Sequence, residues 1–183
     1  TNKAAKEMHE RVSTLLGKRK TRGLTLATFH SLGVRILKKE IERLGYHPNF
    51  SIYDTSDQLA IIREGLKSYK AENKFDRMAI LGKIGFLKNH GIGVEEFPES
   101  SFFDQDDPYD YAVQYVYDYY QDKLKFCNAI DFDDILHMVV KIFKKFPQVA
   151  KQYSDTFRYV MVDEYQDTNS LQFELILGLT SQH

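Results

Sequence analysis

Two adjacent acidic residues, Asp163 and Glu164, directly follow the apolar and β-favouring run Tyr159-Val160-Met161-Val162. In open α/β sheets, ligands bind outside the carboxyl ends of the strands. Neighbouring carboxylates at a strand end point in different directions, so one can hold Mg²⁺ on a nucleotide while the other activates the attacking water. The competing interpretation is a polar turn before a helix, where acidic side chains are favoured. On these residues alone the turn is favoured, because short motifs often match by chance.

The elements that would position these acids follow from the spacing of the apolar residues. The run at 159–162 predicts a strand, and a residue of 168–170 (Thr168, Asn169 or Ser170) can cap the helix after the acids. A second short strand is expected at 24–27, between helices at about 3–16 and 31–44. Strand, acidic turn and helix together indicate an α/β unit.

The middle of the chain, from about residue 45 to about residue 153, has helical signals. Thr55 or Ser56 can cap one helix, and Pro108 fits the first turn of another. The stretch from Glu96 to Asp107 is predicted to be a loop. The fold class that follows is α/β in a mostly helical chain, with part of one α/β domain interrupted by an all-helical insertion.

Two polar segments stand where helices are expected to begin, and helix N-termini favour phosphate through their free N–H groups and positive dipole end. Their residues are Thr1, Asn2, Lys3, Thr28, Phe29, His30 and Ser31. Lys3 would add a positive charge, and the hydroxyls of Thr28 and Ser31 can donate to phosphate. Phe29 or His30 can face a sugar or a base. Taken locally, both segments are more often ordinary helix starts, with Phe29 packed beneath its helix.

Other polar and aromatic clusters favour structural roles. Six tyrosines between residues 109 and 120 do not share one helical face and alternate with acids, which favours helix packing with hydroxyls in water over base stacking. The acids at 131, 133 and 134 lack the spacing of a calcium loop, so we expect Asp131 to cap a helix and Phe132 to pack. The basic run at 18–22 is a solvated loop in one interpretation and a phosphate contact in the other.

The composition, with 43% hydrophobic and 28% charged residues, is that of a globular protein and excludes collagen-like and disordered classes. Because the net charge is −1, any DNA contact must come from local patches. The apolar runs are far shorter than a bilayer requires. The single Cys127 cannot form an internal disulfide, which fits a reducing cytoplasm. Thr1 is not an initiating Met and no leader pattern follows it, so we expect the chain to begin inside a longer protein.

Four segments, in the same order, resemble the superfamily 1 DNA helicases of the Rep/UvrD/PcrA family. The segment Val162-Asp163-Glu164-Tyr165-Gln166-Asp167-Thr168-Asn169 is similar to the family's Walker B segment, motif II. Residues 1–8 resemble motif Ia, Thr28-Phe29-His30-Ser31 resembles motif Ib, and residues 129–136 resemble the end of the family's helical insertion. The resemblance spans the whole chain, and the spacing is most similar to that of Rep.

The resemblance implies roles for individual residues. Asp163 would bind Mg²⁺, and Glu164 would be the general base. Gln166, placed with Glu164 among the catalytic residues, would couple the nucleotide state to the neighbouring domain together with Asp167. The residues of motifs Ia and Ib would contact DNA.

The resemblance also implies the domains and the activity. Residues 1–33 and 145–183 would belong to a RecA-like P-loop motor domain, and residues 34–144 would form its helical insertion, subdomain 1B. The parent protein would be cytoplasmic, with no membrane contact. It would use ATP and Mg²⁺ to move 3′ to 5′ along single-stranded DNA and to unwind duplex. DNA junctions and replication or repair proteins would be its partners.

The phosphate-binding pattern G-x-x-x-x-G-K-[ST] does not occur in these 183 residues. The chain by itself is therefore expected to leave ATP and Mg²⁺ unbound, to hydrolyse no ATP and to unwind no DNA. Residues 34–144 are expected to be the stable unit, while the two strands expose edges through which a second copy can pair. The alternatives are a non-catalytic helical module that binds DNA or protein, and part of a RecB- or AddA-type helicase–nuclease.

Overall fold

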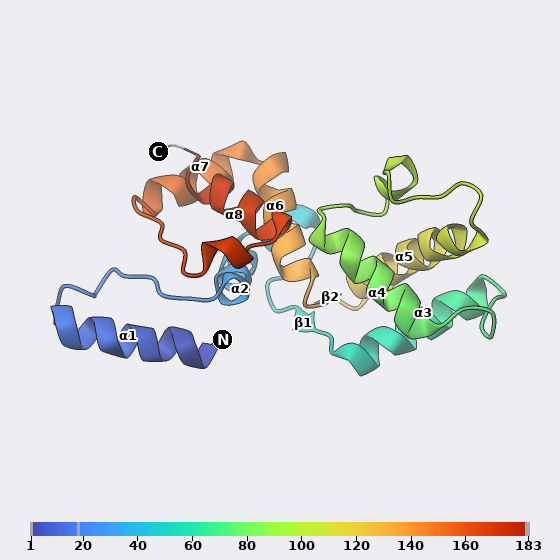
Figure 1. The fold of residues 1–183 in the computed structure, drawn as a ribbon, viewed down its shortest axis with the longest axis horizontal. Coiled ribbons are helices and arrows are strands. Elements are labelled where there is room, and N and C mark those ends of the chain that lie inside the picture. Colours follow the sequence, from blue (N-terminus) through green and yellow to red (C-terminus); the bar gives the residue numbers. More distant parts are fainter. Residues whose placement is uncertain (1, 18, 182–183) are drawn as a thin grey trace.

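The computed structural model describes residues 2–17 and 19–181. The chain is mostly helical, as expected, and the sheet found in this described part consists of two short parallel strands. Figure 1 shows two groups of helices side by side, with the strands between them and the N-terminal helix set apart. No helix of the described residues is both long enough and apolar enough to cross a membrane.

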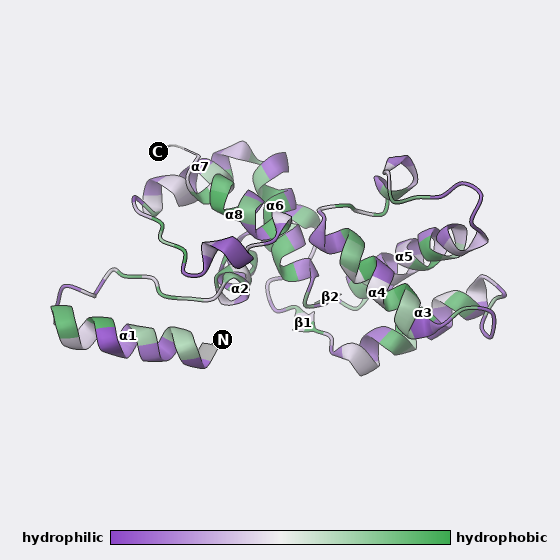
Figure 2. Cartoon of the chain, viewed as in Figure 1, coloured by the Kyte–Doolittle hydropathy of each residue, from purple (hydrophilic) through white to green (hydrophobic). Residues whose placement is uncertain are grey.

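The first group contains four helices, α2 (Phe29–Glu40), α6 (Asp134–Lys145), α7 (Pro147–Thr156) and α8 (Ser170–Leu179). Helix α6 lies at its centre and packs against the other three. Apolar residues recur so closely on α6 that most of its side chains are buried, and Figure 2 shows the same concentration of hydrophobic residues on α6 and α8. This core therefore joins the beginning and the end of the chain.

The predicted helix at 31–44 is confirmed, with its last turn tightened into the 3₁₀ helix η1 (Ile41–Leu44). Gly45 ends it with a φ of +80°, a left-handed conformation that glycine adopts without the steric penalty of a side chain.

The second group contains α3 (Thr55–Ser68), α4 (Arg77–Asn89) and α5 (Pro108–Phe126), joined to the 3₁₀ helix η2 (Phe97–Glu99). Each helix starts with an aspartate whose carboxylate accepts backbone N–H groups of the first turn, at Asp54, Asp76 and Asp107. The prediction that Thr55 or Ser56 caps α3 is wrong, because Asp54 forms a reciprocal capping box with Asp57 one turn later. Pro108 occupies the first turn of α5, as predicted.

The two strands lie where the two groups of helices meet. Strand β1 (Ser51–Ile52) pairs in parallel with β2 (Ala129–Ile130), with Ser51 opposite Ala129 and Ile52 opposite Ile130. Neither strand was predicted, because two residues are too few to give a period. The pairing brings the start of the α3–α5 segment beside its end.

Lys88 of α4 crosses between the two groups inside the protein. Its Nζ donates to Asp131 Oδ2 at 2.6 Å and lies 2.8 Å from Asp134 Oδ1, and Asp134 N donates back to Asp131 Oδ1 at 2.7 Å. Asp131 thus accepts the first N–H of α6, as expected of a capping side chain, although the residue directly before the helix is Asp133, which makes no capping bond. The acids also neutralise a buried lysine that the sequence did not reveal. Tyr120 donates its hydroxyl to Asp131 at 2.8 Å, so the prediction that the tyrosine hydroxyls reach water is wrong at this position.

The two predicted strands at 24–27 and 159–162 are not formed in the described part of the chain. Both segments lack regular secondary structure, and Tyr159 and Met161 are 90% and 91% exposed. A strand needs a hydrogen-bonding neighbour, and neither segment has one here. Helix α1 (Asn2–Leu16), which confirms the helix predicted at 3–16, leads into the first of these segments and leaves Leu15 and Leu16 exposed.

Candidate nucleotide and DNA site

The acids Asp163 and Glu164 form an exposed turn before α8. Glu164 N donates to Asp163 Oδ1 at 3.1 Å, and Glu164 has a φ of +50°, a left-handed conformation that is unfavourable for a residue with a side chain. Such backbone strain occurs most often at functional sites. The 3₁₀ helix η3 (Tyr165–Asp167) continues the turn, and Gln166 Nε2 donates to a carboxylate oxygen of Glu164. The turn therefore presents two carboxylates to solvent and ties one of them to Gln166.

The sequence predicted these acids at the end of a strand, and the structure places them after an irregular segment that pairs with no strand. Asp167 is also exposed, and its N–H bonds to the carbonyl of Glu164 at 2.9 Å. Among the described residues no group of three or more acids, histidines or cysteines converges as a metal site. Two exposed carboxylates suit a Mg²⁺ ion that keeps most of its water and is held mainly by nucleotide phosphates.

The helix start at Thr28 combines capping and packing. Thr28 Oγ1 accepts the N–H of Ser31 at 3.2 Å and donates to Ser31 Oγ at 2.9 Å. Phe29 is partly buried against the first core. The predicted cap at Thr28 and the predicted packing of Phe29 are thus both confirmed. Thr28 and Ser31 are partly exposed at the same helix N-terminus.

The ring of His30 stacks on Phe132, with centroids 3.9 Å apart and planes 17° from parallel. The expected packing of Phe132 is confined to one face of its ring, because the side chain is 55% exposed. Burial lowers the pKa of His30 below its ordinary value, against the opposing effect of Asp133, so the stacked ring is neutral at neutral pH.

Asn89, at the end of α4, connects this aromatic pair to the helix after the acidic turn. Its Nδ2 donates to Asp133 Oδ1 at 2.8 Å, beside Phe132, and its Oδ1 accepts from Asn169 Nδ2 at 3.4 Å. Asn169 also caps α8 through a reciprocal box with Gln172, which confirms it as the cap among the candidates at 168–170. No periodicity could have identified Asn89, because its partners are about 44 and 80 residues away.

The N-terminal segment of the candidate site is described only in part. Thr1 and the side chain of Asn2 lie outside the described residues, and Lys3 is exposed on α1. Lys18 of the basic run also lies outside them. Ser13 and Thr21 approach each other through their hydroxyls at 3.4 Å, so the run folds back onto the end of α1.

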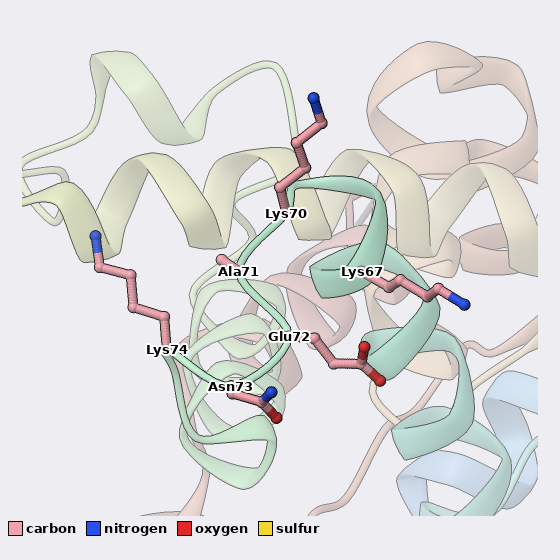
Figure 3. A pocket seen from close by; sticks show the side chains of 6 residues that line it. All are labelled: Lys67, Lys70, Ala71, Glu72, Asn73 and Lys74. Atoms are coloured by element: carbon pink, nitrogen blue, oxygen red, sulfur yellow. The ribbon is translucent and has the colours of Figure 1, made fainter.

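A second basic group lies at the turn between α3 and α4, which the sequence analysis did not single out. Its lysines, at positions 67, 70 and 74, surround a shallow hollow that also involves Glu72 and Asn73. Figure 3 shows the three ammonium groups pointing away from one another. Because they diverge, they raise the local positive potential without forming one anion-binding cradle.

Comparison with known proteins bears directly on these segments. The family model described as the UvrD/REP helicase N-terminal domain matches residues 1–183. The ATP-dependent DNA helicase PcrA of Bacillus subtilis (strain 168) is 43% identical over 185 residues, which cover 100% of this chain and 24% of that protein. The ATP-dependent DNA helicase Rep of Escherichia coli (strain K12) is 37% identical over 176 residues, 96% of this chain and 26% of that protein.

The chain thus spans about a quarter of the length of these relatives. A third relative, the ATP-dependent DNA helicase PcrA of Leuconostoc citreum, is 36% identical over 177 residues. The family match covers the acidic turn, the capped start of α2 and all the helices between them. This chain belongs to the UvrD/REP helicase N-terminal domain family.

Proposed function

We propose that this chain is the part of an ATP-dependent DNA helicase motor that carries the metal- and water-binding acids and one set of DNA contacts. The observation that carries the proposal is the match of the whole chain to the helicase family, combined with an exposed, strained acidic turn at its Walker B-like segment. The complete protein would translocate 3′ to 5′ on single-stranded DNA and unwind duplex at junctions, in the cytoplasm and with replication or repair proteins as partners.

In this proposal the acidic turn divides the chemistry between its residues. Asp163 holds the Mg²⁺ of bound ATP, and Glu164 takes the proton of the attacking water. Gln166, which already bonds to Glu164, orients that carboxylate and, with Asp167, transmits the state of the nucleotide. The exposure of both acids supports these roles, since a hydrated ion and a water molecule must reach them.

The DNA contacts of the proposal lie at helix starts. At motif Ib the Thr28 and Ser31 hydroxyls and the free N–H groups of α2 meet phosphate. The outer face of Phe132, supported from behind by His30, offers a flat ring on which a base can stack. Thr1, Asn2 and Lys3 would add a further phosphate contact at the start of α1.

The proposal assigns residues 1–33 and 145–183 to a RecA-like motor domain and residues 34–144 to its helical insertion. The segments at 24–27 and 159–162 support the assignment, since both consist of β-favouring residues that pair with no strand in the described part of the chain. The chain by itself is proposed to be inactive, because the phosphate-loop pattern G-x-x-x-x-G-K-[ST] does not occur in its sequence. Self-association through the two unpaired segments is part of the same proposal.

The test is ATP hydrolysis by the longer protein that carries this chain, with and without single-stranded DNA. Glu164→Gln should lower the DNA-stimulated rate by about 10²–10⁴-fold, the usual contribution of a general base. Glu72→Gln is the matched control, because Glu72 is an exposed glutamate far along the chain. A Glu164→Gln rate equal to the parent's would reject the proposal and favour a non-catalytic binding module. ATP turnover by these 183 residues alone would reject the proposed inactivity.

A further inference from the structure

Four residues spaced by four, Met78, Gly82, Phe86 and His90, form one line along α4 and its C-terminus. We call this line the α4 stripe. All four residues are exposed, Met78 by 57% and Phe86 by 42%. A Cβ added to Gly82 would find no atom within 4 Å, so the centre of the stripe is open. Met78 and Phe86 thus expose two large apolar side chains on one face of α4, and exposed apolar surface that is continuous marks interaction sites.

Phe102 widens the stripe from a separate segment of the chain. Its ring lies 5.1 Å from that of Phe86 and 5.3 Å from that of His90, centroid to centroid. His90 and Phe86 are themselves 4.1 Å apart, and His90 Nδ1 is 2.8 Å from the carbonyl of Phe86. Three aromatic rings therefore form one surface at the C-terminal half of α4.

The segment that carries Phe102 is held in place. Lys83 Nζ donates to the carbonyl of Phe102 at 3.1 Å and pairs with Asp110 at 3.3 Å. Asp110 in turn accepts the N–H of Asp104 at 2.9 Å, and Phe103 turns inward against the buried Phe97. Because the aromatic surface is already ordered, a partner would not lose affinity to ordering it.

The segment of the chain that carries Phe102 is strongly acidic. Residues 95–107, which we call the acidic loop, contain six acids and no lysine or arginine. The acids are Glu95, Glu96, Glu99, Asp104, Asp106 and Asp107. Such a loop repels phosphate and attracts cations, and arginine also binds favourably over aromatic rings.

We propose that the α4 stripe, Phe102 and the acidic loop form a docking surface for a basic amphipathic helix of a partner protein. Its apolar side chains would cover Phe86 and Phe102, while its arginines and lysines would face the acidic loop. The open position at Gly82 allows the backbone of the partner helix to approach α4 closely. The surface shares no residue with the nucleotide and DNA site, so this inference does not depend on the proposed function.

The probe is a fluorescein-labelled amphipathic peptide of about 18 residues, with leucine on one helical face and arginine on the other. A second peptide replaces each arginine by glutamate. Fluorescence anisotropy of the 183-residue chain should show binding of the arginine peptide only. Phe86→Ala and Phe102→Ala should each weaken binding about tenfold, as central aromatic anchors do. Phe126→Ala is the control, because Phe126 is 87% exposed at the end of α5 and outside this surface.

Gly82→Arg gives a second, independent variant, since the added side chain has open space in the chain itself but would block a docked helix. It should abolish binding while circular dichroism shows an unchanged helical content. If Phe86→Ala fails to fold, binding by Gly82→Arg tests the docking surface on its own.

Unchanged binding of the arginine peptide by Gly82→Arg, or equal binding of the glutamate peptide, would overturn the proposal. Binding of an oligo-dT strand that is lost in Phe86→Ala would instead assign the surface to nucleic acid. A dimer in sedimentation that is lost in Gly82→Arg would assign it to a second copy.

Discussion

Lys88 and Asp134 form an ion pair at 2.8 Å in which neither side chain has exposed surface. Burial by itself would lower the pKa of Lys88, but Asp134 and Asp131 raise it above its ordinary value, so the ammonium group stays charged. The pair joins α4, in the second group of helices, to the first turn of α6, in the first group. Because its charges are shielded from water, the stability of this junction depends on all of its members being present.

Lys88→Met should therefore lower the free energy of unfolding by about 3–5 kcal/mol, the usual cost of leaving buried charges without their partner. Urea unfolding followed by circular dichroism measures the effect. Lys67→Met, on the exposed surface of α3, should change stability by less than about 0.5 kcal/mol. A Lys88→Met protein as stable as the parent would show that water enters this junction.

His137 makes the stability of the chain sensitive to acid. Burial lowers its pKa to about 4, and its Nδ1 lies 3.2 Å from the carbonyl of Lys88. Above its unfolded pKa of 6.5, the ring is neutral in both states. As the pH falls from 6.5 towards 4, His137 becomes protonated in the unfolded chain but stays neutral in the folded chain. The free energy of unfolding therefore falls by about 3 kcal/mol.

His137→Gln removes this titrating group. When the pH is lowered from 7.5 to 4.5, the free energy of unfolding should therefore fall more in the parent than in the variant. Urea unfolding at several pH values gives the difference directly and cancels the titration of the carboxylates that both proteins share. His47→Gln, at an exposed position, is the control substitution. A parent-minus-variant difference that stays constant with pH would contradict the assignment.

Gly178 of α8 is a second point of tight packing. A Cβ at this position would stand within 3.0 Å of the Phe143 ring on α6. Gly178→Ala should destabilise the chain by about 1–3 kcal/mol, because the two helices must separate. Gly82→Ala, where the added methyl group meets nothing, should instead stabilise it by about 0.5–1 kcal/mol. Thermal unfolding of the two variants should therefore shift in opposite directions, and shifts of the same sign would argue against this packing.

Phe132→Ala tests the proposed stacking of a DNA base on the exposed face of this ring. In the longer protein that carries this chain, the variant should bind single-stranded oligo-dT about tenfold more weakly, as expected from the loss of one base–aromatic contact. Because Phe132 is largely exposed, stability should fall only by the small contribution of its stack on His30. Anisotropy titrations with Phe126→Ala as the control distinguish a DNA contact from a general loss of surface hydrophobicity.

The segment at 159–162 should exchange its amide hydrogens quickly in the isolated chain. It has no regular secondary structure and no paired strand, and the side chains of Tyr159 and Met161 are exposed to solvent. Helices α5 and α6 should be protected by comparison. Hydrogen exchange followed by mass spectrometry measures both in one experiment. Strong protection of 159–162 in a monomer would contradict the expectation that the helical part is the stable unit.

The sequence predicted the helices well because their signals are local. Pro108 and Gly45 mark helix boundaries by their backbone geometry alone. The strand predictions were wrong because a strand depends on distant residues. The β-favouring residues at 159–162 form a strand only beside a neighbouring strand, which local residues cannot supply. The pairing of β1 with β2 was missed because it joins positions 78 residues apart, such as Ser51 and Ala129.

The candidate site was predicted to a similar extent. The turn at Asp163 and Glu164 and the cap at Thr28 were identified from residue type and position. Phe132 and Asn89 were not, because their roles come from His30 and Asn169 on other elements. Lys88 was hidden for the same reason, since nothing around it in the sequence indicates that two acids about 45 residues later will enclose it.

The parallel pairing of β1 with β2 has a consequence for the history of this chain. The pairing brings the two ends of residues 53–128 together, and that segment carries a hydrophobic core of its own. A segment with adjoining ends can be lengthened, shortened or exchanged by recombination while the rest of the fold keeps its geometry. At the β1–β2 pair, a related protein can therefore carry a different helical segment in place of residues 53–128 while the rest of its fold is unchanged.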